Sequence, residues 1–170
     1  MYQFRKKVFI VSIILVLYGY LCRLIPINFF WDSKTFGWIL LICVLLLYWI
    51  ELRKKRKQNG KKTGWLLFGI IIISFGLTII TPTIILIKNS EAYITAIDFL
   101  KTDPTIKEKV GNVKSFGLIP FGGLQSRISN GVETGNASFQ IIVNGSKKNM
   151  DVTIYLLKQA DSAWVVTYVR

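Results

Sequence analysis

Histidine is absent from this sequence of 170 residues, and cysteine occurs only twice. The usual zinc, copper and haem sites need clustered His or Cys ligands, so we expect no metal and no cofactor of these kinds. The absence of His also excludes Ser–His and Cys–His catalytic pairs. Both cysteines, Cys22 and Cys43, lie within or at the edge of apolar runs, and the last eighty residues contain none.

Acidic residues are scarce, since nine Asp and Glu stand against 22 Lys and Arg, for a net charge of +13. The imbalance is concentrated in residues 1–87, where twelve basic residues face only Asp32 and Glu51. These basic residues flank apolar runs, which is typical of membrane topology rather than of nucleic-acid binding. With 52% hydrophobic residues and a mean hydropathy of +0.45, the sequence predicts a membrane protein that binds no nucleic acid.

Three apolar runs, at residues 8–25, 36–52 and 65–87, are predicted to cross the bilayer as helices. The first could be a cleaved signal peptide, but no small-residue cleavage site follows it, which favours an uncleaved span. Pro82 predicts a kink or a helix restart in the third run. Two alternatives remain for the small residues of that run, a helix-packing face or an ordinary lipid-facing surface; they are Gly69, Ser74, Gly76 and Thr78.

A strongly basic loop at residues 53–62 separates the second and third runs and is predicted to set the topology. Short loops rich in Lys and Arg stay on the cytoplasmic side of a membrane. Its topology-determining residues are Arg53, Lys54, Lys55, Arg56, Lys57, Lys61 and Lys62. The amino terminus is therefore predicted to be cytoplasmic and residues 88–170 extracytoplasmic. No span carries a central charge, which argues against a transporter or channel.

Residues 88–170 form a second domain, in which charges of both signs and turn residues appear. Ser90 is a predicted cap for a helix that runs to Lys101, and Asp103 is a predicted cap for a helix over residues 104–110. Gly111 suits the left-handed conformation that ends a helix.

Beyond Gly111 the hydrophobic period changes from about 3.6 to 2, which predicts strands. The predicted strands are residues 113–119, 126–133, 137–143, 150–158 and 164–170, and the predicted turns are residues 120–123, 135–136, 144–149 and 159–163. Helices followed by strands indicate an α+β fold, in which two helices pack on one face of a meandering antiparallel sheet of four or five strands.

A set of apolar and turn residues recurs along the second domain after the last span: Ala92, Leu100, Val110-Gly111, Gly122-Gly123, residues 135–139, residues 143–147 and Trp164-Val165-Val166. In these residues the domain resembles the cytochrome oxidase assembly factor one family, which is related in fold to the 21-kilodalton receptor subunit of the mitochondrial inner-membrane translocase. The resemblance implies an assembly role beside a membrane complex such as a respiratory oxidase. Three spans replace the single span of the mitochondrial members, and no Arg/Ser-rich transit segment is present, so we expect a bacterial inner membrane.

The candidate contact residues of this domain each have a structural alternative. Lys147 and Lys148 are predicted on a hairpin loop, either solvated or touching lipid headgroups or an acidic partner. Trp164 is either a core residue or a partner anchor. The acids, among them Asp103 as a cap and Asp161 as a turn residue, are interpreted as solvated surface. The strands near the carboxyl terminus are expected to offer a sheet edge to a partner.

We therefore expect a non-enzymatic, membrane-anchored interaction module that holds a membrane complex through its outer domain. The alternative is a sensor, in which the small sheet encloses a lipid or small molecule and the basic loop signals inside the cell. An apolar cavity in the domain would favour the sensor. Polar side chains converging in one cleft would favour an enzyme, the least expected class.

Overall fold

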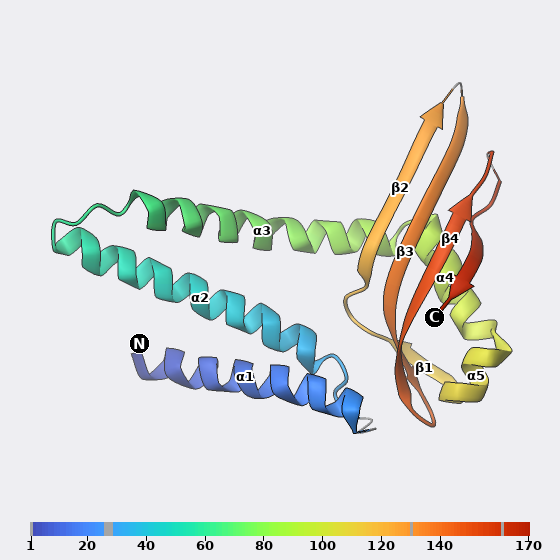
Figure 1. The fold of residues 1–170 in the computed structure, drawn as a ribbon, viewed down its shortest axis with the longest axis horizontal. Coiled ribbons are helices and arrows are strands. Elements are labelled where there is room, and N and C mark those ends of the chain that lie inside the picture. Colours follow the sequence, from blue (N-terminus) through green and yellow to red (C-terminus); the bar gives the residue numbers. More distant parts are fainter. Residues whose placement is uncertain (1, 26–28, 130, 161) are drawn as a thin grey trace. The chain divides into compact units, whose positions relative to one another are not determined.

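The computed structural model describes residues 2–25, 29–129, 131–160 and 162–170 of the chain. It divides into two compact units, Met1–Pro82 and Thr83–Arg170. In chain order, three long apolar helices are followed by two shorter helices and an antiparallel sheet of five strands (Figure 1). This order confirms the predicted α+β architecture with three long apolar helices at the amino-terminal end.

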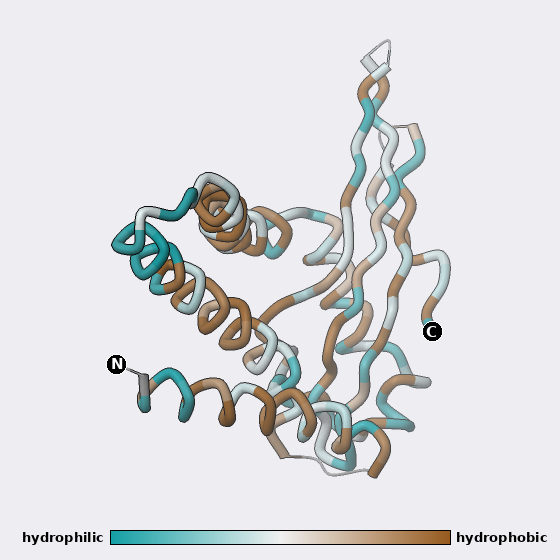
Figure 2. The backbone as a smooth tube through the Cα atoms, turned by 60° about the vertical axis from the view of Figure 1, so that its left-hand side comes forward, coloured by the Kyte–Doolittle hydropathy of each residue, from teal (hydrophilic) through white to brown (hydrophobic). Residues whose placement is uncertain are grey.

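The three long helices are α1 (Tyr2–Leu24), α2 (Ser33–Gln58) and α3 (Gly64–Lys88). Each is long and apolar enough to cross a membrane, which supports the prediction of a membrane protein. In Figure 2 their brown apolar stretches give way to teal hydrophilic residues where α2 meets the connection to α3. The predicted connector before α2 includes Pro26 and Asn28, which lie outside the described residues.

The structure corrects one detail of the predicted spans and narrows another. The basic loop predicted at residues 53–62 is helical as far as Gln58, and only residues 59–63 connect α2 to α3. Lys and Arg are good helix formers, and their positive charges are favourable at a helix carboxyl end, which explains the extension. Of the two alternatives predicted at Pro82, the restart is excluded, because α3 is continuous through this residue, and the kink stays a prediction. Membrane helices tolerate proline when nearby groups satisfy the freed carbonyl.

Small residues let α1 and α2 approach closely as an antiparallel pair. A Cβ atom added to Gly37 would lie 2.8 Å from the backbone nitrogen of Val16, and one added to Gly19 would lie 2.5 Å from that of Lys34. Ser12 is fully buried in this unit. Such contacts hold membrane helices together by van der Waals packing, because lipid supplies no hydrophobic drive.

An ion pair closes the charged end of the same helix pair. The Arg5 guanidinium lies 2.5 Å from the Glu51 carboxylate, and Lys55 lies 3.2 Å from the same side chain.

The small residues of α3 differ in their surroundings, because a Cβ on Gly69 would meet the Trp49 ring, whereas one on Gly76 would meet nothing. The small residues of α3 therefore form no continuous packing face within the described chain.

Two capped helices open the second unit, α4 (Glu91–Thr102) and α5 (Pro104–Val110). The Ser90 hydroxyl accepts a hydrogen bond from the Tyr93 amide at 3.3 Å, and Asp103 accepts one from the Ile106 amide at 2.9 Å. Gly111 has φ of +77° at the end of α5. The predicted caps and the predicted helix end are thus confirmed.

The strands are β1 (Val113–Phe116), β2 (Phe121–Ser129), β3 (Val132–Gly145), β4 (Asn149–Lys158) and β5 (Val165–Val169). Strand β3 is the centre of the sheet, since β4 pairs along one of its sides and β1 and β2 follow each other along the other. Strand β5 pairs with the far side of β4. The long β2–β3 hairpin is visible in Figure 1.

Two predicted turns are strand segments instead. Gly122 and Gly123 pair with Phe139 and Ser138 inside the β2–β3 ladder. A Cβ on Gly122 would lie only 1.9 Å from the Ser138 carbonyl oxygen, so this glycine permits a close backbone approach rather than a turn. The predictions of a bend at residues 120–123 and of a first strand reaching residue 119 are therefore wrong.

The predicted turn at residues 135–136 is also wrong, because Gly135 lies within β3 and pairs with both neighbours. The Trp164 ring occupies the space that a Cβ on Gly135 would need, 2.6 Å away. The hairpin instead reverses between Ser129 and Val132. The sequence there reads Asn130-Gly131, the strongest short hairpin signal, although the turns predicted above do not include it.

The core of the second unit lies between α4, α5 and one face of the sheet. Phe139 is fully buried, and its ring meets that of Tyr93 edge-on with centroids 5.6 Å apart. Alternate residues of β3 and β4 face the helices, because side chains alternate along a strand. The other buried residues include Ala96, Leu100, Ile106, Val110, Ile141, Val143, Val152, Ile154 and Leu156.

Candidate functional site

Four polar side chains converge where the helix-facing side of the sheet extends toward the β2–β3 hairpin. The Lys158 side chain is only 11% exposed, and its ammonium donates a 2.5 Å hydrogen bond to the Glu133 carboxylate. Ser126 donates to the other oxygen of Glu133 at 2.6 Å, and Glu91 lies 3.9 Å from Lys158. Two carboxylates thus lie beside a largely covered lysine side chain, and a hydroxyl donates to one of them, as is typical of a structural ion pair.

The hydrogen bond from Lys158, followed by that from Ser126, lowers the pKa of the Glu133 carboxyl below its ordinary value of 4.5. A carboxylate held ionised in this way is a poor general base near neutral pH. Among the residues that the structure describes, no group of three His, Cys, Asp or Glu side chains could hold a metal ion.

Acid is expected to weaken this ion pair. Because the pKa of Glu133 is lower in the folded chain than in the unfolded one, its contribution to stability is present above pH 4.5 and is lost as the pH falls through the lowered pKa. The free energy of unfolding of Glu133→Gln should lie below that of the unaltered chain at neutral pH, and the difference should shrink below about pH 4.5. Urea unfolding across this pH range measures the difference, and the control is Glu108→Gln, at an exposed position of α5. A difference that stays constant with pH would contradict the assignment.

The contact residues predicted from the sequence lie in separate places. Lys147 and Lys148 are exposed on the connection between β3 and β4, where the Lys147 amide donates to the Val110 carbonyl at 2.9 Å. Trp164 is 8% exposed and belongs to the core, so its ring is not a surface contact. Asp161 lies outside the described residues.

The outer edge of β2 is the most exposed part of the sheet. All nine residues from Phe121 to Ser129 are exposed, and among the residues that the structure describes β2 pairs with β3 alone. Three apolar side chains are included, Phe121 at 54%, Leu124 at 40% and Ile128 at 73% exposure. An unpaired strand edge of this length is a template for another strand, and natural sheets usually protect it with charges or proline. Arg127 is the single charged residue of β2.

The pairing register tells which main-chain groups of β2 face outward. Ser129 pairs with Val132 across a two-residue connection, and the pair next to such a connection exchanges both hydrogen bonds. The pairs then alternate, so the N–H and C=O groups of Leu124 and Ser126 face away from β3. The edge predicted near the carboxyl terminus also exists, as the shorter β5.

Two open hollows lie against the same hairpin. One, of about 500 Å³, is lined by residues that include Gln125, Ser138 and Tyr155, and the other, of about 800 Å³, by residues that include Arg127 and Gln159. Both lie on the surface of the sheet and are not enclosed by apolar walls. They therefore widen the accessible surface beside β2 and do not provide the apolar cavity that would favour a sensor.

No protein-family model, no curated protein and no solved structure matches this chain. The resemblance to the assembly-factor family therefore remains a hypothesis, and it is supported only by the residues named for it in the sequence.

Proposed function

We propose that this chain is a non-enzymatic, membrane-anchored interaction module whose second unit binds an extended segment of a membrane protein complex along β2. The observation that carries the proposal is the exposed, unpaired edge of β2 over Phe121 to Ser129. A partner strand added there gains main-chain hydrogen bonds from the outward groups of Leu124 and Ser126. Exposed Leu124 and Ile128 supply side-chain contacts on one face of the added strand.

The anchor supports the same proposal. Three apolar helices fix the second unit to a bilayer, and tethering raises the effective concentration of the edge beside other membrane proteins. We place the amino terminus and the connection from α2 to α3 in the cytoplasm, because Lys and Arg gather there, and the second unit outside a bacterial inner membrane. The assembly-factor resemblance makes a respiratory oxidase the first complex to test.

A photo-crosslinking side chain at Ile128 tests the proposal in native membranes. It should form a specific adduct with one membrane protein, because this residue lies beside the edge and is 73% exposed. The matched control is Ile94, which is 51% exposed on α4 and away from β2. Equal labelling from both positions, or none from Ile128, would refute the proposed binding edge.

A further inference from the structure

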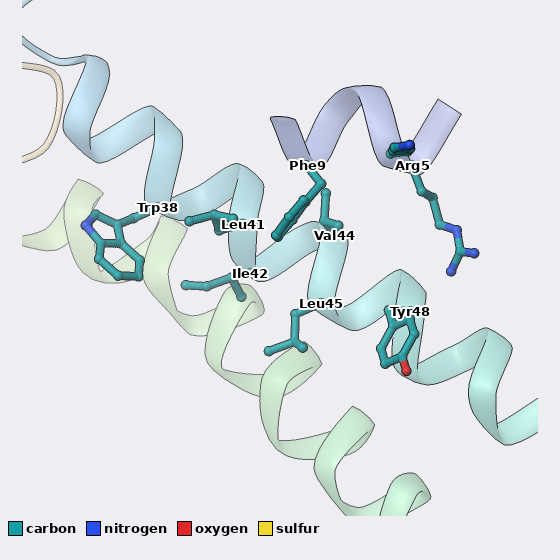
Figure 3. Close-up of a pocket in the computed structure, with 9 residues that line it drawn as sticks. Arg5, Phe9, Trp38, Leu41, Ile42, Val44, Leu45 and Tyr48 are labelled. Atoms are coloured by element: carbon teal, nitrogen blue, oxygen red, sulfur yellow. The ribbon is translucent and has the colours of Figure 1, made fainter. Parts of the chain in front are cut away.

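An open apolar groove of about 460 Å³ lies between α1 and α2. Figure 3 shows Trp38 at one end of its lining residues, Phe9 and Val44 in the middle, and Arg5 and Tyr48 at the other end. Neither polar nor charged side chains line the stretch between the two ends. The proposed strand-binding edge makes no use of this groove.

The length of the groove matches one leaflet of a bilayer. Tyr48 lies ten positions after Trp38, so at about 1.5 Å per residue the groove runs about 15 Å along α2, half of a hydrocarbon core of about 30 Å. The side chains of Phe9 and Leu45 are 45% and 43% exposed, so the surface between the ends can be covered by another molecule. A groove of this length and polarity fits an acyl chain.

The charged end of the groove favours a lipid with an anionic headgroup. Arg5 and Lys6 both line it, and Glu51 is the acid that pairs with Arg5. Lys6 is exposed, and the basic residues of the last turns of α2 add further positive charge near Glu51. Basic residues at the end of a groove between membrane helices suit an anionic phosphate at headgroup depth.

We propose that this groove binds one anionic phospholipid, with an acyl chain along Phe9 and Leu45 and the phosphate beside Lys6 and Arg5. A free phosphate would need only the basic residues of the groove, and a neutral lipid would need only its apolar wall. An anionic phospholipid is the ligand that uses both. The orientation proposed above places this lipid in the cytoplasmic leaflet, but binding itself requires only insertion into a bilayer.

The test uses the full chain in nanodiscs of equal parts phosphatidylglycerol and phosphatidylcholine, followed by native mass spectrometry of the lipid retained in detergent. The unaltered chain should retain phosphatidylglycerol in excess over its input share. Lys6→Gln should lower that excess about fivefold, the contribution of one basic residue near a membrane surface. Lys7→Gln is the matched control, since Lys7 does not line the groove, and it should leave the excess within twofold.

A second variant separates a lipid from a phosphate ion. Leu45→Trp fills the apolar wall and should remove the retained lipid, whereas Leu47→Trp, on a residue of similar exposure outside the groove, should retain it. Equal effects of Lys6→Gln and Lys7→Gln would show diffuse surface charge and overturn the site. Loss with Lys6→Gln but not with Leu45→Trp would show a phosphate contact without an acyl chain, and would also overturn it. Neither result bears on binding at β2.

Discussion

Replacing Phe139 with alanine is expected to lower the free energy of unfolding of the second unit by about 3–5 kcal/mol. The ring is fully buried between the sheet and α4, and it meets Tyr93 edge-on at 5.6 Å. Removal of the ring loses the transfer free energy of its buried atoms. It also leaves a cavity in the core, and the cost of that cavity adds to the loss. A unit of this size has a total stability of about 5–15 kcal/mol, so the loss is a large share of it.

Pulse proteolysis of the full chain in detergent, across a urea series, measures this change through the midpoint of cleavage within the second unit. The control is Phe121→Ala, because Phe121 is 54% exposed at the start of β2. Its midpoint should move by much less. Similar shifts for the two variants would mean that Phe139 does not occupy the centre of the core.

Leu124→Pro is expected to lower recovery of the Ile128 adduct by about tenfold, whereas Leu124→Ala should lower it only modestly. The N–H of Leu124 faces away from β3, so proline leaves the β2–β3 ladder intact and removes a donor from the outer edge, as edge strands permit. Loss of one net hydrogen bond costs about 0.5–1.5 kcal/mol, and the proline ring also obstructs an added strand.

The two variants at this position distinguish main-chain binding from side-chain binding. Quantification of the adduct after affinity purification gives the recovery, and the urea midpoint shows that both variants remain folded. Equal losses with proline and alanine would mean that the Leu124 side chain binds the partner and that no strand is added. That outcome would still place the partner at the surface of β2, but it would contradict binding by strand addition.

The sequence predicted the architecture well because its strongest signals are local. Long apolar runs predict the helices α1, α2 and α3, and the side chains of Ser90 and Asp103 cap the helices that follow. These signals depend only on neighbouring residues, so no tertiary information is needed to interpret them. The same is true of the alternation along β3 and β4, which predicts the buried face of the sheet.

The errors arise where a residue serves a distant contact. Gly135 is a turn residue by its type, but in the fold it makes room for the Trp164 ring, which is 29 positions away in the chain. Gly122 likewise serves the close approach of β2 to Ser138. The exposed edge of β2 could not be predicted for the same reason, because the glycines among its first residues predict a bend. The α1–α2 groove depends on the packing of two helices and has no local sequence signal.

Cysteine accessibility in intact cells tests the sidedness on which the proposed function depends. In a chain with Cys22→Ala and Cys43→Ala, single cysteines are placed at Asn59, beside the basic end of α2, and at Lys148, on the exposed connection between β3 and β4. A membrane-impermeant maleimide should label Lys148→Cys in intact cells and Asn59→Cys only after permeabilisation. Labelling of Asn59→Cys in intact cells, with Lys148→Cys protected until lysis, would contradict the account.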